Sequence, residues 1–274
     1  MVFSITRDMP GVAATTRRRL VGTSTKMYFD YGRSVTYAQH VAELCNNHHS
    51  FPLVNPSGDQ LLDIFVIPDF VSITRVNEEL QRSTSEIWTG AQDTHDEDSG
   101  AYTGEVSAKS LAQVGCRIVE IGHAERRRLF GETDEWVVRK AIAIHRNGMI
   151  PLVCVGEAEE GTICEAALAC FHQIEGVLRA LPDADIVVAY EPVWAIGAAQ
   201  PASPEYIAGV VSELRVRCLS TFRRSDGSLR IIYGGAAGPG LFQAISAHVD
   251  GLFLGRMAHR PEAFIDTILE VAGA

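Results

Sequence analysis

The chain has 274 residues, of which 46% are hydrophobic and 21% are charged, values typical of a globular enzyme. No stretch approaches the roughly 18 consecutive apolar residues that a membrane-spanning helix needs, which argues against a membrane protein. The formal net charge of −10 argues against a general nucleic-acid-binding protein, whose phosphate contacts require clustered lysines and arginines. An anionic substrate would therefore need a local positive site.

The beginning of the chain differs in composition from the rest. Residues 1–19 are rich in arginine, serine and threonine and contain Asp8 as the only acid, a composition faintly similar to that of a transit peptide. We favour a flexible N-terminal extension over these residues, followed by a single domain over residues 20–274.

Six cysteines are scattered along the chain without a C-x-x-C pair, and several fall in apolar patterns. We expect them to be reduced and mostly buried, which favours a cytoplasmic location. They are Cys45, Cys116, Cys154, Cys164, Cys170 and Cys218.

Short, β-branched apolar runs recur along the chain and predict eight strands. The runs are Leu20–Thr23, Leu62–Ile67, Ile87–Ala91, Arg117–Ile121, Ile150–Val155, Ile186–Ala189, Arg230–Tyr233 and Gly251–Leu254. Segments between them have apolar residues at helical spacing and begin with proline or acids. These predicted helices are Val35–Asn46, Glu135–Asn147, Thr162–Ala180, Pro204–Phe222 and Pro261–Ala272.

The alternation of strands and helices indicates parallel strands joined by helical crossovers. A continuous apolar strand such as "IPLVCV" must be buried on both faces, which favours a closed (β/α)8 barrel with an outer ring of helices. An open doubly wound sheet is the alternative. That fold usually carries G-x-G-x-x-G after its first strand, and "VGTSTKM" does not match this motif.

In such a barrel, the polar residues that follow the strands would meet at one end. They are Lys26, Gln92, Asp93, His123, Glu125, Glu157 and Glu191, followed by Gly234 with Gly235 and by Gly255 with Arg256. Glycines after the last two strands, next to helix N-termini, are typical of phosphate binding in barrels, although a glycine pair can also be a simple turn. The pattern therefore favours a small phosphorylated substrate.

Glu191 ends an apolar run and begins "EPVWAIGAAQPAS", a segment that favours neither helix nor strand and predicts a mobile flap. The carboxylate could be structural and accept hydrogen bonds from a neighbouring loop. Enclosed by a flap, it would instead be a stronger base toward a carbon-bound proton, because the flap removes its hydration.

His123 and Lys26 complete a candidate set. His123 precedes the short helical segment "AERRRLF" and could simply cap it or lie in the core, but a helix N-terminus also favours a neutral, proton-donating imidazole. Lys26 could balance substrate charge or pair with Glu125. A base, a neutral electrophile and a cation together predict enolisation, in which a proton leaves the carbon beside a polarised carbonyl group.

At these residues the sequence resembles the triosephosphate isomerase family, over nearly the whole chain after residue 20. The motifs "TKM", "GAQDTHDEDSGAYTGEVS", "EIGHAERRRLFGETDE", "PLVCVGE", "AYEPVWAIG", "YGGA" and "DGLFLG" have the family's order and spacing. The resemblance implies an aldose–ketose isomerase of glycolysis and gluconeogenesis that interconverts D-glyceraldehyde 3-phosphate and dihydroxyacetone phosphate through an enediolate. It implies no cofactor, and "THDED" and "HHS" lack the spacing of a zinc helix, so we expect no metal.

The resemblance also assigns roles, and a glutamate base, a neutral histidine and a water-excluding lid are this family's known machinery. Glu191 would be the base, His123 the electrophile and Lys26 the electrostatic anchor, with Glu125 as a supporting or proton-relay carboxylate. The substrate and phosphate site would comprise Ser24, Gly197, Gly234, Gly235, Ala236, Gly255 and Arg256. The lid would comprise Pro192, Val193, Trp194, Ala195, Ile196, Ala198, Ala199 and Gln200, with hinges at Pro192–Trp194 and Gln200–Ala202.

The loop "DSGAYTGEVS" resembles the one by which this family reaches into a neighbouring subunit, with Tyr102 and Thr103 at its tip. The resemblance therefore implies a homodimer with two-fold symmetry. A surface Ω-loop is the alternative.

Several positions depart from the family pattern. Ser24-Thr25 stands where the family has Asn-Trp, Ala236 replaces a serine that would contact phosphate, and Pro201 would stiffen the second hinge. Arg256 replaces a glycine and could either bind phosphate or fill the pocket and turn outward.

These departures leave two alternatives to a triosephosphate isomerase. The "G-T-S" start and "G-R" end also resemble the branch that isomerises erythrulose phosphates, in which a trimmed amide could leave room for another carbon. The other alternative is a phosphate-ligand-binding barrel that has lost catalysis.

Overall fold

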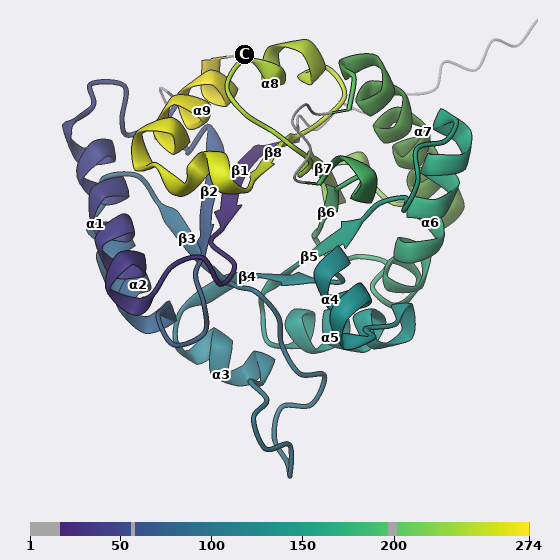
Figure 1. Ribbon diagram of the computed structural model, residues 1–274, viewed down its shortest axis with the longest axis horizontal. Coiled ribbons are helices and arrows are strands. Elements are labelled where there is room, and N and C mark those ends of the chain that lie inside the picture. Colours follow the sequence, from purple (N-terminus) through teal and green to yellow (C-terminus); the bar gives the residue numbers. More distant parts are fainter. Residues whose placement is uncertain (1–16, 56–57, 197–201, 274) are drawn as a thin grey trace, which may run out of the picture.

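The computed structural model describes residues 17–55, 58–196 and 202–273, and shows a closed barrel of parallel strands surrounded by helices (Figure 1). The strands follow one another around the barrel from β1 to β8, and β8 pairs with β1 to close it. The predicted single-domain (β/α)8 barrel is confirmed. The strands are β1 (Arg19–Ser24), β2 (Leu62–Ile67), β3 (Ile87–Ala91), β4 (Cys116–Ile121), β5 (Ile150–Val155), β6 (Ile186–Tyr190), β7 (Leu229–Tyr233) and β8 (Gly251–Leu254).

The helices form the outer ring in Figure 1. They are α1 (Tyr31–Asn47), α2 (Ile73–Leu80), α3 (Ala108–Gln113), α4 (Ala124–Phe130), α5 (Asp134–Arg146), α6 (Ile163–Ala180), α7 (Pro204–Phe222), α8 (Leu241–Ile245) and α9 (Pro261–Gly273). The sequence did not predict α2, α3 and α8, because helices of one or two turns are too short to repeat an apolar pattern. In the described part of the chain, no helix is both long and apolar enough to cross a membrane.

The barrel begins earlier than the sequence predicts. β1 starts at Arg19 instead of Leu20, and two arginines before it form ion pairs at the N-terminal end of the barrel: Arg17 with Asp250 at 2.6 Å and Arg18 with Asp63 at 2.9 Å. The expected flexible extension of residues 1–19 is therefore too long by these three residues. Its remaining part lies outside the described residues.

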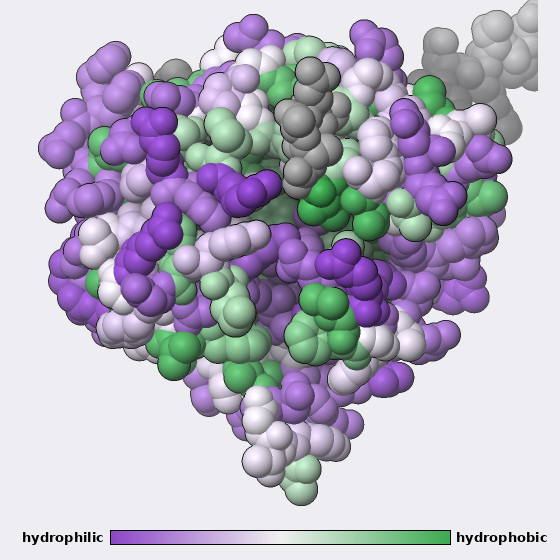
Figure 2. All heavy atoms as spheres, viewed as in Figure 1, coloured by the Kyte–Doolittle hydropathy of each residue, from purple (hydrophilic) through white to green (hydrophobic). Residues whose placement is uncertain are grey.

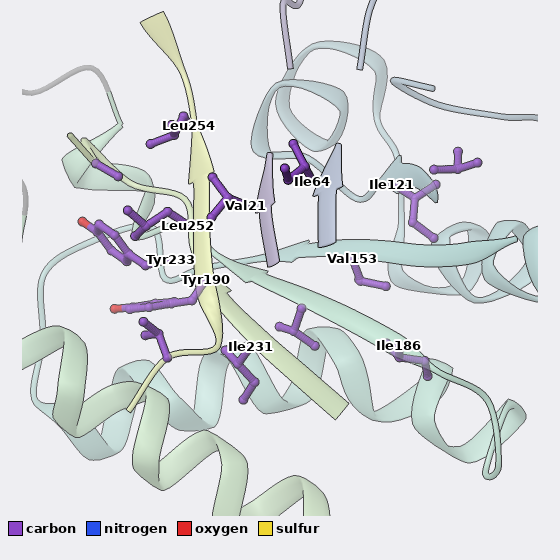
Figure 3. Packing of buried hydrophobic residues seen from close by; sticks show 14 of the residues in the cluster. Val21, Ile64, Ile121, Val153, Ile186, Tyr190, Ile231, Tyr233, Leu252 and Leu254 are labelled. Carbon is purple, nitrogen blue, oxygen red and sulfur yellow. The ribbon is translucent and has the colours of Figure 1, made fainter. Parts of the chain in front are cut away.

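The strands are buried on both faces, which explains their continuous apolar sequences. One set of side chains points outward beneath the helices, as Figure 3 shows for residues such as Val21, Ile64 and Val153. The other set fills the barrel. It consists of Leu20, Phe65, Ile67, Trp88, Ile118, Leu152, Cys154, Val187, Ala189, Ile232 and Phe253.

The cysteine prediction is also confirmed. None of the six cysteines forms a disulfide, and all except Cys164 are buried.

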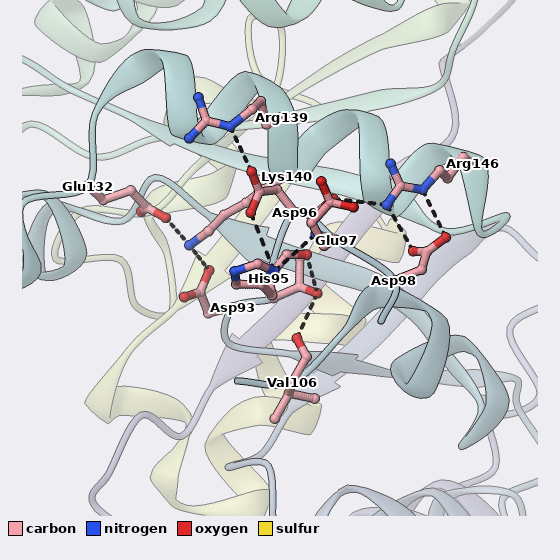
Figure 4. Close-up of polar contacts among 11 residues, drawn as sticks. Asp93, His95, Asp96, Glu97, Asp98, Val106, Glu132, Arg139, Lys140 and Arg146 are labelled. Atoms are coloured by element: carbon pink, nitrogen blue, oxygen red, sulfur yellow. Dashed lines mark hydrogen bonds and ion pairs between the residues drawn. The ribbon is translucent and has the colours of Figure 1, made fainter. Parts of the chain in front are cut away.

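A buried charge cluster ties α5 to the loop that follows β4 (Figure 4). The Nζ atom of Lys140 lies 2.7 Å from Asp93 Oδ1 and also pairs with Glu132. The other carboxylate oxygen of Glu132 accepts a hydrogen bond at 3.1 Å from the backbone N–H of Gly122. The cluster therefore fixes the backbone immediately before His123.

Replacing Lys140 with methionine should destabilise the fold by about 3–5 kcal/mol, because the buried carboxylate of Glu132 would lose its cation and Asp93 would keep only Arg126. The free energy of unfolding in urea measures this effect.

Arg139→Met is the matched control, because Arg139 lies next to Lys140 on α5 and pairs with Asp96 in the loop after β3. The side chain of Arg139 is 57% exposed, so the loss of this ion pair should cost about 1 kcal/mol or less. Equal losses in the two variants would contradict the assigned role of the buried cluster.

Candidate active site

A cavity of about 680 Å³ opens at the C-terminal end of the strands. Figure 2 shows this face hollowed near the centre of the barrel, with hydrophilic and hydrophobic side chains around the depression. The structure brings together most of the residues that the sequence singled out. Those that line the cavity are Ser24, Lys26, His123, Glu125, Glu191, Ile196, Gly234, Gly235, Ala236, Gly255 and Arg256.

His123 and Glu191 are in direct contact and are both buried. His123 Nε2 lies 3.3 Å from Glu191 Oε2, while the backbone N–H of Glu125 donates a hydrogen bond to His123 Nδ1 at 3.1 Å. A ring nitrogen that accepts a hydrogen bond carries no proton, so the proton of the neutral ring is on Nε2. His123 thus caps α4 through one nitrogen and presents the other to Glu191.

The charge state of His123 depends on opposing influences. Burial lowers the pKa of His123, but the neighbouring charges of Glu191 and Glu120 outweigh burial and raise the pKa to about 9. The hydrogen bond at Nδ1 acts in the other direction, because a doubly protonated ring could not accept it. The neutral imidazole that the sequence predicts stays a prediction.

Lys26 is held in an uncommon backbone conformation with its ammonium group toward the cavity. Its φ angle is +47°, a region that usually costs a residue with a side chain on the order of 1–3 kcal/mol, and Gln92 donates a hydrogen bond to its carbonyl oxygen at 2.9 Å. Its Nζ lies 2.9 Å from Glu125 Oε1. Burial lowers the pKa of Lys26, but the hydrogen bond to Glu125 and the charge of Glu191 raise it overall. Lys26 therefore stays protonated at neutral pH.

Two glycines leave the space that Glu191 occupies. A Cβ atom on Gly156 would overlap the carbonyl oxygen of Glu191, and one on Gly234 would overlap its side chain. The backbone N–H of Glu191 donates to the carbonyl oxygen of Val155 at 2.8 Å. The carboxylate is therefore positioned by close backbone approach from β5 and β7.

The first predicted hinge of the lid is anchored by Glu157. Glu157 Oε1 accepts hydrogen bonds from Trp194 Nε1 at 2.8 Å, Tyr206 OH at 3.1 Å and Tyr190 OH at 3.2 Å. Contrary to the expectation that this segment favours no helix, Val193–Ala195 forms a short 3-10 helix. The rest of the predicted lid, Gly197, Ala198, Ala199 and Gln200, lies outside the described residues together with Pro201, so the lid stays a prediction.

The side of the cavity near β7 and β8 is electropositive. Arg256 lies exposed at its wall, and in the described part of the chain no ion pair engages it. Burial lowers the pKa of His259, and the charges of Arg33, Arg256 and Lys26 lower it further. This side could therefore accept the anionic end of a substrate.

The comparison with known protein families agrees with this geometry. A family model described as triosephosphate isomerase matches residues 19–271. The chain belongs to the triosephosphate isomerase family. It is therefore an isomerase, and this family implies a small phosphorylated sugar as the substrate.

Several relatives of the chain within the triosephosphate isomerase family are named L-erythrulose-1-phosphate isomerase. The protein from Pectobacterium atrosepticum is 43% identical, over 91% of this chain and 94% of the relative. Those from Rhizobium etli and Rhizobium meliloti are 36% and 34% identical, each over 93% of this chain and over 92% and 97% of the relative.

The loop that resembles this family's subunit-contacting loop lies apart from the cavity. It projects between β3 and α3 at the bottom of Figure 1, with Tyr102 and Thr103 exposed. Arg139 and Arg146 hold its base through ion pairs with Asp96 and Asp98 (Figure 4). The homodimer and the Ω-loop both stay predictions.

Sequence reasoning missed Glu120, which points into the barrel immediately below this isomerase site. It follows Ile118 by two residues on β4, and alternate residues of a strand share a face. Burial and the charge of Glu191 raise the pKa of Glu120, while His123, Lys26 and Ser24 lower it; the result is about 7. The available signal was a single carboxylate in the middle of the apolar run "RIVEI".

Glu120→Gln should change how stability depends on pH. The folded-state pKa of Glu120 is about 7 against an ordinary value of 4.5, so the wild type loses stability as pH rises through this window, because the unfolded chain releases the proton first. Glutamine cannot ionise. The variant should therefore gain on the order of 3 kcal/mol relative to the wild type between pH 4.5 and pH 8.

Urea unfolding of both proteins at several pH values measures this difference. If the difference between the two free energies of unfolding stays constant with pH, Glu120 does not have a raised pKa in the folded protein.

Proposed function

We propose that the protein isomerises L-erythrulose 1-phosphate through an enediolate. The names of the relatives favour this four-carbon alternative over the three-carbon substrate that the sequence first predicts. The mechanism rests on one observation: His123 and Glu191 are in contact within one cavity, which Lys26 also lines.

In this mechanism, Glu191 removes the proton from C3 of the substrate. The electron pair of that bond forms a C2–C3 double bond, while the carbonyl oxygen on C2 takes negative charge. His123 Nε2 donates a hydrogen bond to this oxygen, and Lys26 stabilises the charge. Return of the proton to C2, with the hydroxyl proton of C3 moving to the oxygen on C2, leaves the carbonyl group on C3.

The phosphate group binds at the β7 and β8 side of the cavity. Gly235 and Gly255 allow the ligand to approach the backbone closely, and Arg256 supplies a guanidinium group that no ion pair occupies among the described residues. An arginine can bind phosphate with two parallel hydrogen bonds. This contact would offset the hydroxyl group that Ala236 cannot provide.

Turnover of L-erythrulose 1-phosphate and of dihydroxyacetone phosphate by the wild type and by Glu191→Gln tests the proposal. We expect the wild type to prefer the four-carbon substrate, and the variant to lose at least about 10²-fold in kcat because its base is gone. Glu86→Gln, an exposed glutamate outside the cavity, is the control and should retain wild-type turnover.

The outcomes separate the alternatives. Preference for dihydroxyacetone phosphate would restore the three-carbon assignment, and no turnover of either substrate would favour the barrel that only binds phosphate ligands. Undiminished kcat in Glu191→Gln would contradict the role of the base. Loss of activity in EDTA would contradict the expectation of a reaction without metal.

We also infer that the protein is a cytoplasmic homodimer that uses the loop with Tyr102 and Thr103. The unpaired cysteines support the location. In the loops that follow β1 and β2, Met27 is 94% exposed and Val71 is 83% exposed, and exposed apolar side chains that gather into a patch mark protein–protein interaction sites.

Thr103→Arg should separate the dimer into monomers, because it adds a long charged side chain to the tip of the loop. Sedimentation velocity at several protein concentrations measures the mass in solution. A wild type that stays at the mass of one chain would contradict the dimer.

A further inference from the structure

Glu120 is a carboxylate in the apolar interior of the barrel, and it is only 3% exposed. Cys154 Sγ lies 4.0 Å from Glu120 Oε1 and 3.9 Å from Glu191 Oε1. Glu120 is therefore separated from the candidate base by a single thiol group. A carboxylate at this depth is unfavourable unless something donates hydrogen bonds to it.

Other buried carboxylates of the barrel have such donors. Asp63 pairs with Arg230 at 2.5 Å, and Asp250 pairs with Arg215 at 2.7 Å. For Glu120, by contrast, the described residues provide no ion pair, and its donors are the thiol group of Cys154 and the hydroxyl group of Ser24, whose hydrogen bond lowers the pKa of the carboxyl group.

The nearest nitrogen groups that could donate to Glu120 point elsewhere. The Nζ atom of Lys26 is directed to Glu125, and the Nε2 atom of His123 is directed to Glu191. Both are close enough to lower the pKa of Glu120, but neither satisfies its oxygens. Glu120 therefore retains capacity to accept hydrogen bonds.

Ser24 is the second polar group with unused hydrogen-bonding capacity at this depth. Its side chain lines the cavity and is 3% exposed, and its Oγ atom has no hydrogen-bond partner of ordinary geometry within the described residues. A side-chain hydrogen bond from Ser24 outside that geometry still helps lower the pKa of Glu120, so the two groups act together. We call Glu120 and Ser24 together the floor pair.

The chemistry of the floor pair selects the kind of group that it can bind. A carboxylate accepts hydrogen bonds, and a hydroxyl group both donates and accepts them. The floor pair therefore suits an alcohol, and it repels a phosphate, which would bind instead toward Arg256. A ligand with a phosphate at one end and a hydroxyl group at the other would be aligned across Glu191 and His123.

L-Erythrulose 1-phosphate has this form. It is dihydroxyacetone phosphate in which one hydrogen on the hydroxylated, reacting carbon is replaced by a hydroxymethyl group. The reacting carbon must meet Glu191, and the phosphate extends to the β7 and β8 side. The hydroxymethyl group is then left to extend toward the interior of the barrel, where the floor pair lies.

We propose that Glu120 and Ser24 bind the terminal hydroxymethyl group of the four-carbon substrate and thereby set the preference over triose phosphates. This inference rests on the proposed function. The hydroxyl group donates a hydrogen bond to Glu120 and exchanges one with Ser24, which holds the C3–H bond toward Glu191. A triose phosphate leaves the remaining acceptor sites of Glu120 without a donor, and sites built to bind a hydroxyl group reject analogues that lack it.

The test compares kcat/KM for L-erythrulose 1-phosphate and dihydroxyacetone phosphate in Glu120→Leu, Glu120→Gln and the wild type. We expect Glu120→Leu to lower kcat/KM for the four-carbon substrate by about 10²-fold or more and to affect the three-carbon substrate much less. Glu120→Gln should fall between, because its amide oxygen still accepts a hydrogen bond. Ser24→Asn should shift the preference the same way, since its larger side chain fills the space of the hydroxymethyl group.

Ile118→Val, on the same face of β4 but one layer deeper, is the control and should leave the ratio of the two kcat/KM values unchanged. If Glu120→Leu does not fold, the test rests on the ratio of the two kcat/KM values in Glu120→Gln, compared with the same ratio in the wild type. Equal losses on both substrates, with the wild-type preference intact, would overturn the role of the floor pair and leave the proposed function standing. No four-carbon turnover by the wild type would overturn both.

Discussion

The parallel pairing of β1 with β8 is the constraint on which the rest of the structure depends. The backbone N–H of Leu20 donates to the carbonyl oxygen of Asp250 at 2.9 Å, and any side chain at Gly251 would overlap the backbone of Leu20. Only a glycine permits the two strands to approach at this point. Closure then brings the C-terminal ends of the eight strands to one rim, so that Lys26, His123 and Glu191 meet despite their separation in sequence.

The charged side chains of the site interact because barrel closure brings them together. Glu120, Glu125 and Glu191 surround Lys26 and His123: Lys26 pairs with Glu125, while His123 lies between Glu125 and Glu191. Lys26 therefore stays positive, whereas proton exchange between the His123–Glu191 pair and a ligand belongs to the proposed mechanism. The carboxylate without a cation lies deepest, where an uncharged hydroxyl group is the most favourable partner.

The sequence predicted the strands well because a strand buried on both faces must be continuously apolar. Four of the predicted strands, among them Leu62–Ile67 and Ile150–Val155, coincide with the observed ones, and long helices such as Pro204–Phe222 were equally clear. Short helices lacked enough residues to show a period. The candidate residues could be found because they follow strands, where the barrel topology alone decides which end they share.

The features that the sequence could not show depend on the direction in which a strand side chain points and on local backbone geometry. The apolar run that predicted β4 also contains Glu120. The side-chain direction of Glu120 is known only once the structure shows that Ile118 points into the barrel. The positive φ of Lys26 and its support by Gln92 arise from a contact between two loops. The hydrogen bond from the backbone N–H of Glu125 to His123 Nδ1 could likewise be identified only from the position of α4.

The opposite end of the barrel has a consequence for how the site is used. Arg230 and Asp63 meet inside the barrel at its N-terminal end, and the apolar layer that contains Phe65 and Ile232 lies between them and the cavity. Among the described residues, this layer closes the cavity toward the N-terminal end of the barrel. Reactant and product must therefore both pass on the side where the strands end, so a departing isomer and the next molecule to enter use the same face of the barrel.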